Sequence, residues 1–361
     1  MTESLPDHGA RLTIDLAALA ANYRLLAARA APAETAAVVK ADAYGLGIEA
    51  VVPALARAGC VSFYVAHLSE AARVRAVAPA ATIFVLNGLP PGSASRFAKL
   101  QARPVLGSAE EAAEWRASGG GPCALHVDTG MNRLGLRPEE AAGLDLTGLG
   151  VTTILTHFVS SECPEAPINA AQRATFRQIM TMWPDKLASM PNSSAFFHEE
   201  RLFVGQFRAG YALYGGNPTP ERDNPMHPVV SLRAPIVQVR PVPRGETVGY
   251  NQRWTARRDS IIATISVGYA DGYPRNGANT DTRAGGAGRL GGVLCPFAGN
   301  VSMDLITLDI TDAPARHQRR GEEISLIDEV LTVDVVGPAA GTIGYEILTG
   351  LGRRYNRTYR T

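Results

Sequence analysis

Cysteine is scarce in this sequence, and the few cysteines lie far apart. Only four occur in 361 residues, and no two of them form a C-x-x-C pair: Cys60, Cys123, Cys163 and Cys295. Four widely separated cysteines argue against a disulfide framework and against a structural zinc site, so neither is expected. The sequence therefore predicts no metal site and fits a reducing compartment.

An excess of charge of one sign is also missing, as are long hydrophobic runs. The 35 Lys and Arg residues balance 34 Asp and Glu residues, so the chain lacks the broad basic surface that nucleic-acid binding requires. No apolar run approaches the roughly 20 residues of a membrane-spanning helix. The first apolar stretch lacks a basic start and is interrupted by Asp15, unlike a signal peptide. We expect a cytoplasmic protein that binds a small molecule, with no nucleic-acid or membrane partner.

What the sequence does contain is a regular alternation of short apolar strands and helical segments through its first two thirds. Eight strands are predicted, at 35–40, 62–66, 81–88, 103–106, 123–130, 150–158, 186–194 and 201–210. Eight parallel β-α units favour a closed (β/α)₈ barrel over a doubly wound open sheet, which would use fewer strands for this length. We therefore predict an α/β fold with a barrel domain at residues 16–232.

Beyond residue 230 the sequence changes to alternating, β-branched segments separated by glycine and proline turns. This pattern predicts a second, mainly β C-terminal domain. Residues 11–19 read as a strand that turns into a helix, and this strand is expected to join the β-rich domain. That domain is thus predicted to comprise residues 1–15 and 233–361.

In a barrel of this kind the chemistry lies on the loops that follow the strand C-termini. Residues suited to binding a phosphate, an aromatic ring and an amine occur there: Lys40, Tyr44, Arg133, His157, Asn192, Ser193, Arg208, Gly210 and Tyr211. Each has an ordinary structural alternative, such as a helix cap, a surface charge, or a lysine that extends from a strand end into solvent. A lysine desolvated at a strand end instead loses its proton readily and can form an imine with pyridoxal 5′-phosphate.

Eight segments, in order, carry a resemblance to a known family. They are VVKADAYGLG (38–47), HVDTGMNRLG (126–135), LTHF (155–158), NSS (192–194), FRAGYALYGG (207–216), ISVGYADGYPR (265–275), GNVSMDLITLD (299–309) and GTIGYEILTGLGRRY (341–355). Over essentially its whole length the chain resembles the bacterial alanine racemases, which are fold-type III pyridoxal-phosphate enzymes. The resemblance implies an isomerase that interconverts L- and D-alanine. The role associated with it is D-alanine supply for peptidoglycan, and alanine catabolism stays an alternative.

The resemblance further implies a two-base mechanism, because a racemase removes a proton from one face of the α-carbon and returns one to the other. Lys40 is expected to bind the cofactor covalently and to act as one base. Tyr269 matches the second base, and His157 is expected to assist it through a hydrogen bond.

The remaining site residues are also assigned by the resemblance. Arg208 matches the partner of the pyridine nitrogen, and Arg133 matches a contact of the cofactor's phenolic oxygen and the substrate carboxylate. Met303 is expected to bind the substrate through its backbone, with Asp304 orienting the site. The expected phosphate contacts are Tyr44, Asn192, Ser193, Gly210, Tyr211 and Tyr345.

The resemblance says less about how subunits assemble and which amino acid is the preferred substrate. The resemblance implies a homodimer in which each site takes Lys40 from one subunit and Tyr269 from the other. Two positions depart from the family pattern, since His126 stands where many members have lysine and Asn300 where arginine is usual. A broader racemase that also accepts serine stays an alternative, as does a non-catalytic pyridoxal-phosphate protein, although such carriers typically lack a second domain.

Overall fold

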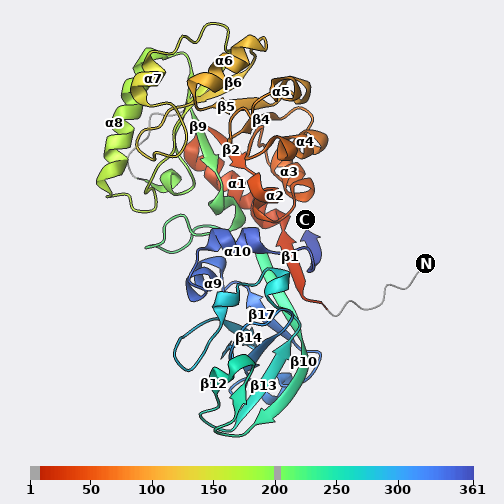
Figure 1. Cartoon of the computed structure of the whole chain (residues 1–361). Helices are drawn as coiled ribbons and strands as arrows, with labels where there is room; N and C mark the ends of the chain where they lie inside the picture. Colours follow the sequence, from red (N-terminus) through yellow and green to blue (C-terminus); the bar gives the residue numbers. More distant parts are fainter. Residues whose placement is uncertain (1–8, 199–204) are drawn as a thin grey trace, which may run out of the picture. The chain divides into compact units, whose positions relative to one another are not determined.

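The computed structural model describes residues 9–198 and 205–361 and divides into two compact units. The barrel unit comprises Leu19–His227, coloured orange to green in Figure 1. The β unit combines the described part of Met1–Ala18 with Pro228–Thr361. Within the described ranges, every helix is too short or too polar to cross a lipid bilayer.

Eight parallel strands close into a barrel, in the same order as in the sequence. They are β2 (Glu34–Val38), β3 (Ser62–Val65), β4 (Thr82–Val85), β5 (Arg103–Leu106), β6 (Cys123–His126), β7 (Val151–Leu155), β8 (Leu187–Ser189) and β9 (Gln206–Ala209). The barrel closes where β9 pairs with β2, from Glu34 opposite Gln206 to Ala37 opposite Ala209. The predicted barrel is confirmed; residues 201–204 of the last predicted strand lie outside the described residues.

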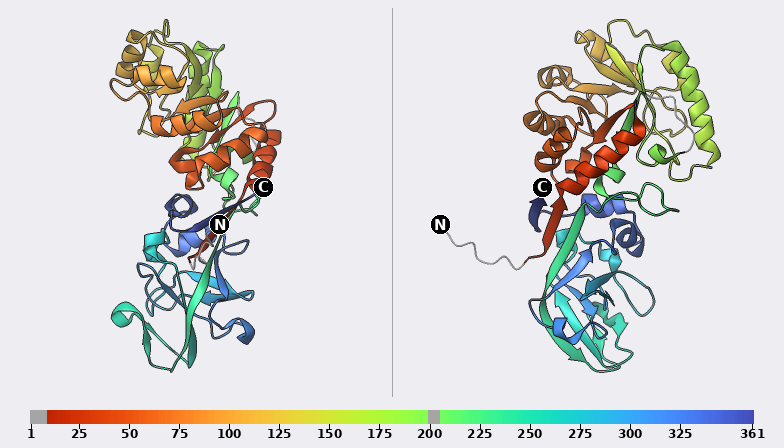
Figure 2. Two further views of the ribbon diagram at one scale, coloured as in Figure 1. Left: turned by 90° about the vertical axis from the view of Figure 1, so that its right-hand side faces the viewer. Right: turned by 180° about the vertical axis from the view of Figure 1, so that it is seen from behind.

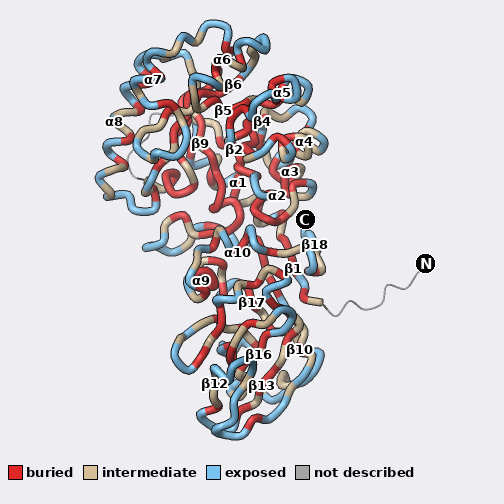
Figure 3. The backbone as a smooth tube through the Cα atoms, in the orientation of Figure 1, coloured by how far each residue is buried: buried red, intermediate tan, exposed pale blue. Residues whose placement is uncertain are grey.

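Helices cover the outside of this barrel (Figure 2). They are α1 (Leu16–Ala30), α3 (Ile48–Arg57), α4 (Leu68–Val77), α5 (Ala94–Leu100), α6 (Ala109–Ala117), α7 (Pro138–Ala142) and α8 (Pro167–Met182). In α3 the buried residues Ile48, Val51, Val52 and Leu55 repeat at helical spacing, so they form one apolar face. The strands are apolar on both faces because the interior and the helices each bury one side (Figure 3).

The β unit is built around one long strand, β10 (Val230–Val242). It pairs with β1 (Arg11–Asp15), β17 (Glu323–Ile327) and β13 (Ser260–Ile265). The register shifts between Leu232 and Arg233 and again between Ile236 and Gln238. Irregularities of this kind bend a strand. They let β10 pair with β1 and β17 along its first half and with β13 along its second half. The other strands are β11 (Thr247–Val248), β12 (Trp254–Thr255), β14 (Ala287–Leu290), β15 (Val293–Pro296), β16 (Ile306–Asp309) and β18 (Asn356–Arg360).

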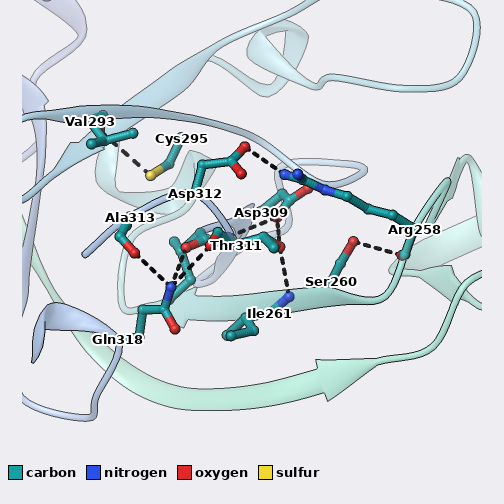
Figure 4. A network of polar contacts seen from close by, with 11 residues as sticks. Arg258, Ser260, Ile261, Val293, Cys295, Asp309, Thr311, Asp312, Ala313 and Gln318 are labelled. Atoms are coloured by element: carbon teal, nitrogen blue, oxygen red, sulfur yellow. Dashed lines mark hydrogen bonds and ion pairs between the residues drawn. The ribbon is translucent and has the colours of Figure 1, made fainter. Parts of the chain in front are cut away.

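A polar network fixes the turn that follows β16 (Figure 4). The backbone N–H of Ile261 donates to Thr311 Oγ1 at 2.8 Å, which ties this turn to β13. Gln318 Nε2 donates to the carbonyls of Ile310, Thr311 and Ala313. The network therefore holds the C-terminal end of β16 against β13.

Two short helices of the β unit were not predicted, α9 (Val333–Ala339) and α10 (Gly344–Gly350). Both contain glycine, which is a poor helix former and hid them in the sequence. At Gly337 an added Cβ would lie 2.8 Å from the backbone nitrogen of Gly344. The absence of a side chain therefore permits the close approach of the two helices.

Candidate active site

The segment after Lys40 has an unusual backbone. Strand β2 ends at Val38, and the next element, α2 (Lys40–Tyr44), is a turn in which Ala41, Asp42, Ala43 and Tyr44 all have positive φ, between 53° and 57°. Left-handed helical geometry costs roughly 1–2 kcal/mol per L-residue. Backbone strain of this kind is concentrated at functional sites in proteins. Lys40 thus starts a strained left-handed turn at the C-terminal end of a barrel strand.

The amine of Lys40 lies in a cationic surrounding. Its side chain retains exposed surface, yet enough protein surrounds the amine that desolvation lowers its pKa, and the charges of Arg133 and Arg208 lower it further. The negative charge of the Glu70 carboxylate raises the pKa of Lys40. A lysine whose pKa is lowered has a larger fraction of neutral amine, the form that attacks a carbonyl.

Arg208 is buried on β9 and donates to five acceptor atoms of four residues at the ends of β7 and β8. Its Nη1 donates to the carbonyl and hydroxyl oxygens of Ser189, at 2.8 and 2.7 Å. Its Nη2 donates to Thr156 O at 2.6 Å and to His157 Nδ1 at 3.3 Å, with a further contact to Met190 O. Among the described residues, no hydrogen-bond partner is present for the Nε–H group. One donor of a rigidly held guanidinium is therefore left for a ligand.

Two histidines at the strand ends are held neutral. Desolvation and the charge of Arg208 lower the pKa of His157 to about 3 and that of His126 to about 4. Because an arginine only donates, His157 Nδ1 must accept from it, and the proton of the neutral ring lies on Nε2. His157 is thus a hydrogen-bond donor at Nε2, and His126 is an uncharged side chain.

An uncharged cradle lies next to Lys40. Ser193 Oγ accepts hydrogen bonds from the backbone N–H groups of Gly210 and Ala212, at 3.0 and 3.2 Å. An added Cβ at Gly210 would lie 2.6 Å from the hydroxyl of Tyr44, so only glycine fits. The Tyr44 ring stacks on Tyr214 with centroids 4.5 Å apart, and burial raises its pKa. Hydroxyl and backbone donors from three segments therefore converge here.

The other predicted barrel residues border this cradle or the lysine. Asn192 accepts a hydrogen bond from the backbone of Ala195, and the buried Tyr211 begins the 3₁₀ turn after Gly210. Arg133 is exposed in the loop after β6 and follows Asn132, whose φ is 54°. The positive charge of Arg133 contributes to the lowered pKa values of Lys40, His126 and His157.

The remaining predicted residues belong to the β unit. The backbone N–H of Tyr269 donates to Ser302 O, and that of Ala270 donates to Met303 O, both at 3.0 Å. The side chains of Tyr269 and Met303 are 40% and 53% exposed, so both are available to a ligand. Asp304 accepts from Arg354 at 2.9 Å, and Tyr345 is half-buried in α10.

The β unit has a second exposed tyrosine, which was not predicted from the sequence. Tyr250, 72% exposed, starts a 3₁₀ turn after β11, and its carbonyl accepts from Asn300 Nδ2 at 3.0 Å. Asn251 and Gln252, which follow it, have φ values of 63° and 51°. Asn300 also opens the segment that leads to Met303. The signal that could have revealed Tyr250 is the Gly249–Tyr250–Asn251 sequence, which is typical of a turn.

Most of the non-glycine residues with positive φ lie beside three of the side chains described above. In the described part of the chain they are Ala41, Asp42, Ala43, Tyr44, Gln101, Asn132, Asn251 and Gln252. Gln101 caps the C-terminus of α5, where such geometry is common. The others adjoin Lys40, Arg133 or Tyr250. This distribution points to those three side chains as functional.

A barrel whose strand ends carry a lysine of lowered pKa, a buried donor-only arginine and an uncharged cradle defines a class of protein. It is the class of barrel enzymes that bind a phosphorylated aldehyde cofactor through a lysine. Family models described as the N-terminal and the C-terminal domain of alanine racemase match residues 14–218 and 229–359. The chain belongs to the alanine racemase family.

Individual relatives agree with this assignment. The alanine racemase of Methylobacterium nodulans is 56% identical over 363 residues, covering 98% of this chain and 96% of the relative. That of Acidiphilium cryptum is 50% identical over 359 residues, covering 97% and 98%. A crystal structure of alanine racemase from Bartonella henselae with covalently bound pyridoxal phosphate superposes with a TM-score of 0.92 at 36% identity, covering 98% and 100%. The predicted family, fold and enzyme class are confirmed.

Proposed function

We propose that this chain interconverts L- and D-alanine and holds pyridoxal 5′-phosphate on Lys40. Family membership over both domains confirms the predicted reaction and cofactor. The assignment to Lys40 rests on one observation, its lowered pKa beside two guanidinium groups at a barrel strand end. The match of residues 229–359 to the C-terminal racemase domain disfavours a non-catalytic barrel protein.

The residues around Lys40 fit the cofactor. When bound, pyridoxal phosphate withdraws electrons from the substrate α-carbon and so makes its proton removable. The unpartnered Nε–H of Arg208 is suited to donate to the pyridine nitrogen. Because a guanidinium keeps its proton, this contact holds the nitrogen unprotonated and moderates the electron withdrawal. A moderate electron sink favours simple proton exchange over side reactions.

The cradle fits a phosphate. We assign the phosphate contacts to Tyr44, Asn192, Ser193, Gly210, Tyr211 and Tyr345. Burial keeps Tyr44 protonated and therefore a donor. Neutral donors bind a phosphate without adding charge near Lys40, which preserves the cationic surrounding of the amine.

Two residues must exchange protons with opposite faces of the α-carbon. Lys40 is one of them. The second is a tyrosine of the β unit, for which there are two candidates. Tyr269 is the residue assigned by the GYADG motif, and its backbone is bonded to the Met303 loop. Tyr250 is more exposed and precedes two residues of positive φ, which makes it the second candidate.

The remaining roles follow from chemistry and charge. Arg133 binds the substrate carboxylate together with the backbone of Met303, and the Nε2–H of His157 donates to the tyrosine base. The barrel domain at 16–232 holds the cofactor, and the β-rich domain at 1–15 and 233–361 supplies the tyrosine. We propose a cytoplasmic homodimer in which each site combines residues of two subunits, with alanine preferred over serine or larger amino acids.

One experiment tests this proposal. Purified protein is incubated with a panel of L-amino acids, with and without added pyridoxal phosphate, and D-amino acids are measured. Cofactor-dependent D-alanine formation is expected, together with a visible absorbance band that Lys40→Ala abolishes. Tyr250→Phe and Tyr269→Phe are assayed in parallel; the base is the tyrosine whose loss abolishes racemisation while the visible band persists. Retention of band and activity by Lys40→Ala would refute the role of Lys40.

A further inference from the structure

The strained turn after Lys40 is held by side chains to which the proposed mechanism gives no role. Four consecutive residues, Ala41–Tyr44, adopt left-handed geometry without a glycine among them. Such a backbone persists only where surrounding contacts hold it. Backbone hydrogen bonds within the segment supply some of these contacts, and two charged residues of α4, Glu70 and Arg73, supply others through Asp42 in the middle of the turn. We call Asp42, Glu70 and Arg73 the turn clamp.

Glu70 uses both of its carboxylate oxygens on backbone donors. Its Oε1 accepts from the backbone N–H of Asp42 at 3.3 Å. Its Oε2 accepts from the N–H groups of Ala66 and His67, at 2.9 and 3.1 Å. The side chain therefore joins the end of β3 to the left-handed turn, and each of its oxygens is needed.

Arg73 holds the turn through the side chain of Asp42. Its Nη2 donates to Asp42 Oδ1 at 2.5 Å, and the same oxygen accepts from the backbone N–H of Ile48 at 3.1 Å. Arg73 also donates to Glu49 on α3, at 2.7 and 2.6 Å. The Arg73–Asp42 pair is about one third exposed, so its geometry is partly shielded from solvent.

The clamp also contributes to the electrostatics of the site. The carboxylate of Glu70 raises the pKa of Lys40, whereas Arg133 and Arg208 lower it. Glu70 is thus linked to Lys40 in two independent ways, through the backbone of Asp42 and through its charge.

We propose that Glu70 and Arg73 are positioning residues that hold the left-handed turn through Asp42, so that the amine of Lys40 is presented to the cofactor. This inference rests on the proposed role of Lys40. In the Glu70→Gln variant one carboxylate oxygen becomes an amide nitrogen, which only donates and cannot accept from a backbone N–H. At least one backbone contact is lost, either to Asp42 or to Ala66 and His67, and the link between the end of β3 and the turn is weakened.

The test compares holoenzyme variants by kinetics and by visible circular dichroism of the bound cofactor. An achiral cofactor has this signal only when it is held in one orientation, so it reports the presentation by Lys40 and not general stability. For Glu70→Gln we expect kcat for L-alanine to fall on the order of ten- to a hundredfold and the signal to weaken. Glu49→Gln is the matched control: it changes the other carboxylate that accepts from Arg73 while leaving Glu70 and Asp42 intact, and should leave kcat within about twofold.

A second substitution separates positioning from charge. Glycine adopts left-handed geometry without strain, so Ala41→Gly should reduce the dependence of the turn on its clamp. In the Glu70→Gln background, Ala41→Gly should restore at least half of the dichroism signal and raise kcat severalfold. Failure of this rescue, or a Glu70→Gln variant equal to Glu49→Gln, would overturn the inference. Failure of the proposed function would appear separately, as a visible band that survives in Lys40→Ala.

Discussion

Replacing Gly210 by alanine introduces a methyl group into a space that the Tyr44 hydroxyl occupies. The new Cβ would lie 2.6 Å from the hydroxyl oxygen and 3.4 Å from the ring carbon that bears it. The Tyr44 ring is buried and stacked on Tyr214, with centroids 4.5 Å apart. The ring has little room to retreat, so either the tyrosine or the backbone at 210 must shift.

The size of the effect follows from two contributions. Overpacking of a dense interior costs about 1–3 kcal/mol, which would appear as a lower free energy of unfolding. Displacement of the Tyr44 hydroxyl removes a hydrogen bond to a charged phosphate, with a contribution of about 1.5–3 kcal/mol. The dissociation constant of pyridoxal phosphate should therefore rise roughly 10- to 150-fold.

The assay pairs denaturant unfolding with a titration of cofactor binding followed by absorbance. Gly143→Ala is the control, because Gly143 has a negative φ of −85° and its added Cβ would lie 3.6 Å from the carbonyl oxygen of Glu139, an ordinary van der Waals distance. It should change stability by no more than about 0.5–1 kcal/mol. Adding Tyr44→Phe to Gly210→Ala should restore stability without restoring affinity, since the clashing oxygen is also the donor. Gly210→Ala and Gly143→Ala variants that behave alike would refute this reasoning.

Three further predictions follow from the site. Mixing inactive Lys40→Ala protein with an inactive Tyr250→Phe or Tyr269→Phe variant should restore about a quarter of wild-type activity after subunit exchange, and none if each site comes from one subunit. Arg208→Lys should lower the unfolding free energy by roughly 2–5 kcal/mol, because a single ammonium cannot serve all the acceptors of the guanidinium; an unchanged denaturation midpoint and slope would contradict this. His157 has its pKa lowered to about 3 in the folded protein against about 6.5 when unfolded, so between these values the unfolded state binds more protons. Stability should fall as pH drops through this window, by up to about 1.4 kcal/mol per pH unit, and urea titrations should show a shallower loss for His157→Gln.

The barrel could be predicted from the sequence because its information is local. Each strand is a short apolar run bounded by turn residues, and each helix repeats apolar residues on one face, as in α3. Burial on both strand faces makes that pattern strong. The order of strands then follows from the right-handed, sequential connections of β-α units. The position of Lys40 at a strand end belongs to the same local pattern.

Other features depend on residues far apart in the chain, and the sequence alone did not reveal them. No local propensity favours four left-handed residues in a row, as at Ala41–Tyr44. The contacts that Glu70 and Arg73 make with this turn come from a helix about 30 residues further along the chain. The short helices α9 and α10 were likewise hidden by their glycines, one of which is required for packing.

The site was predictable as a set of residue types and not as an arrangement. Ordinary pKa values would leave His157 partly charged near neutral pH, and only its burial beside Arg208 makes it a neutral donor. Tyr250 escaped notice because its exposure and strained backbone exist only in the folded β unit. The sequence by itself determined the barrel, the lysine and the family. The tertiary structure decided the charge states, the strain and the competing tyrosine, because desolvation and backbone strain are set by neighbours that folding brings from distant parts of the chain.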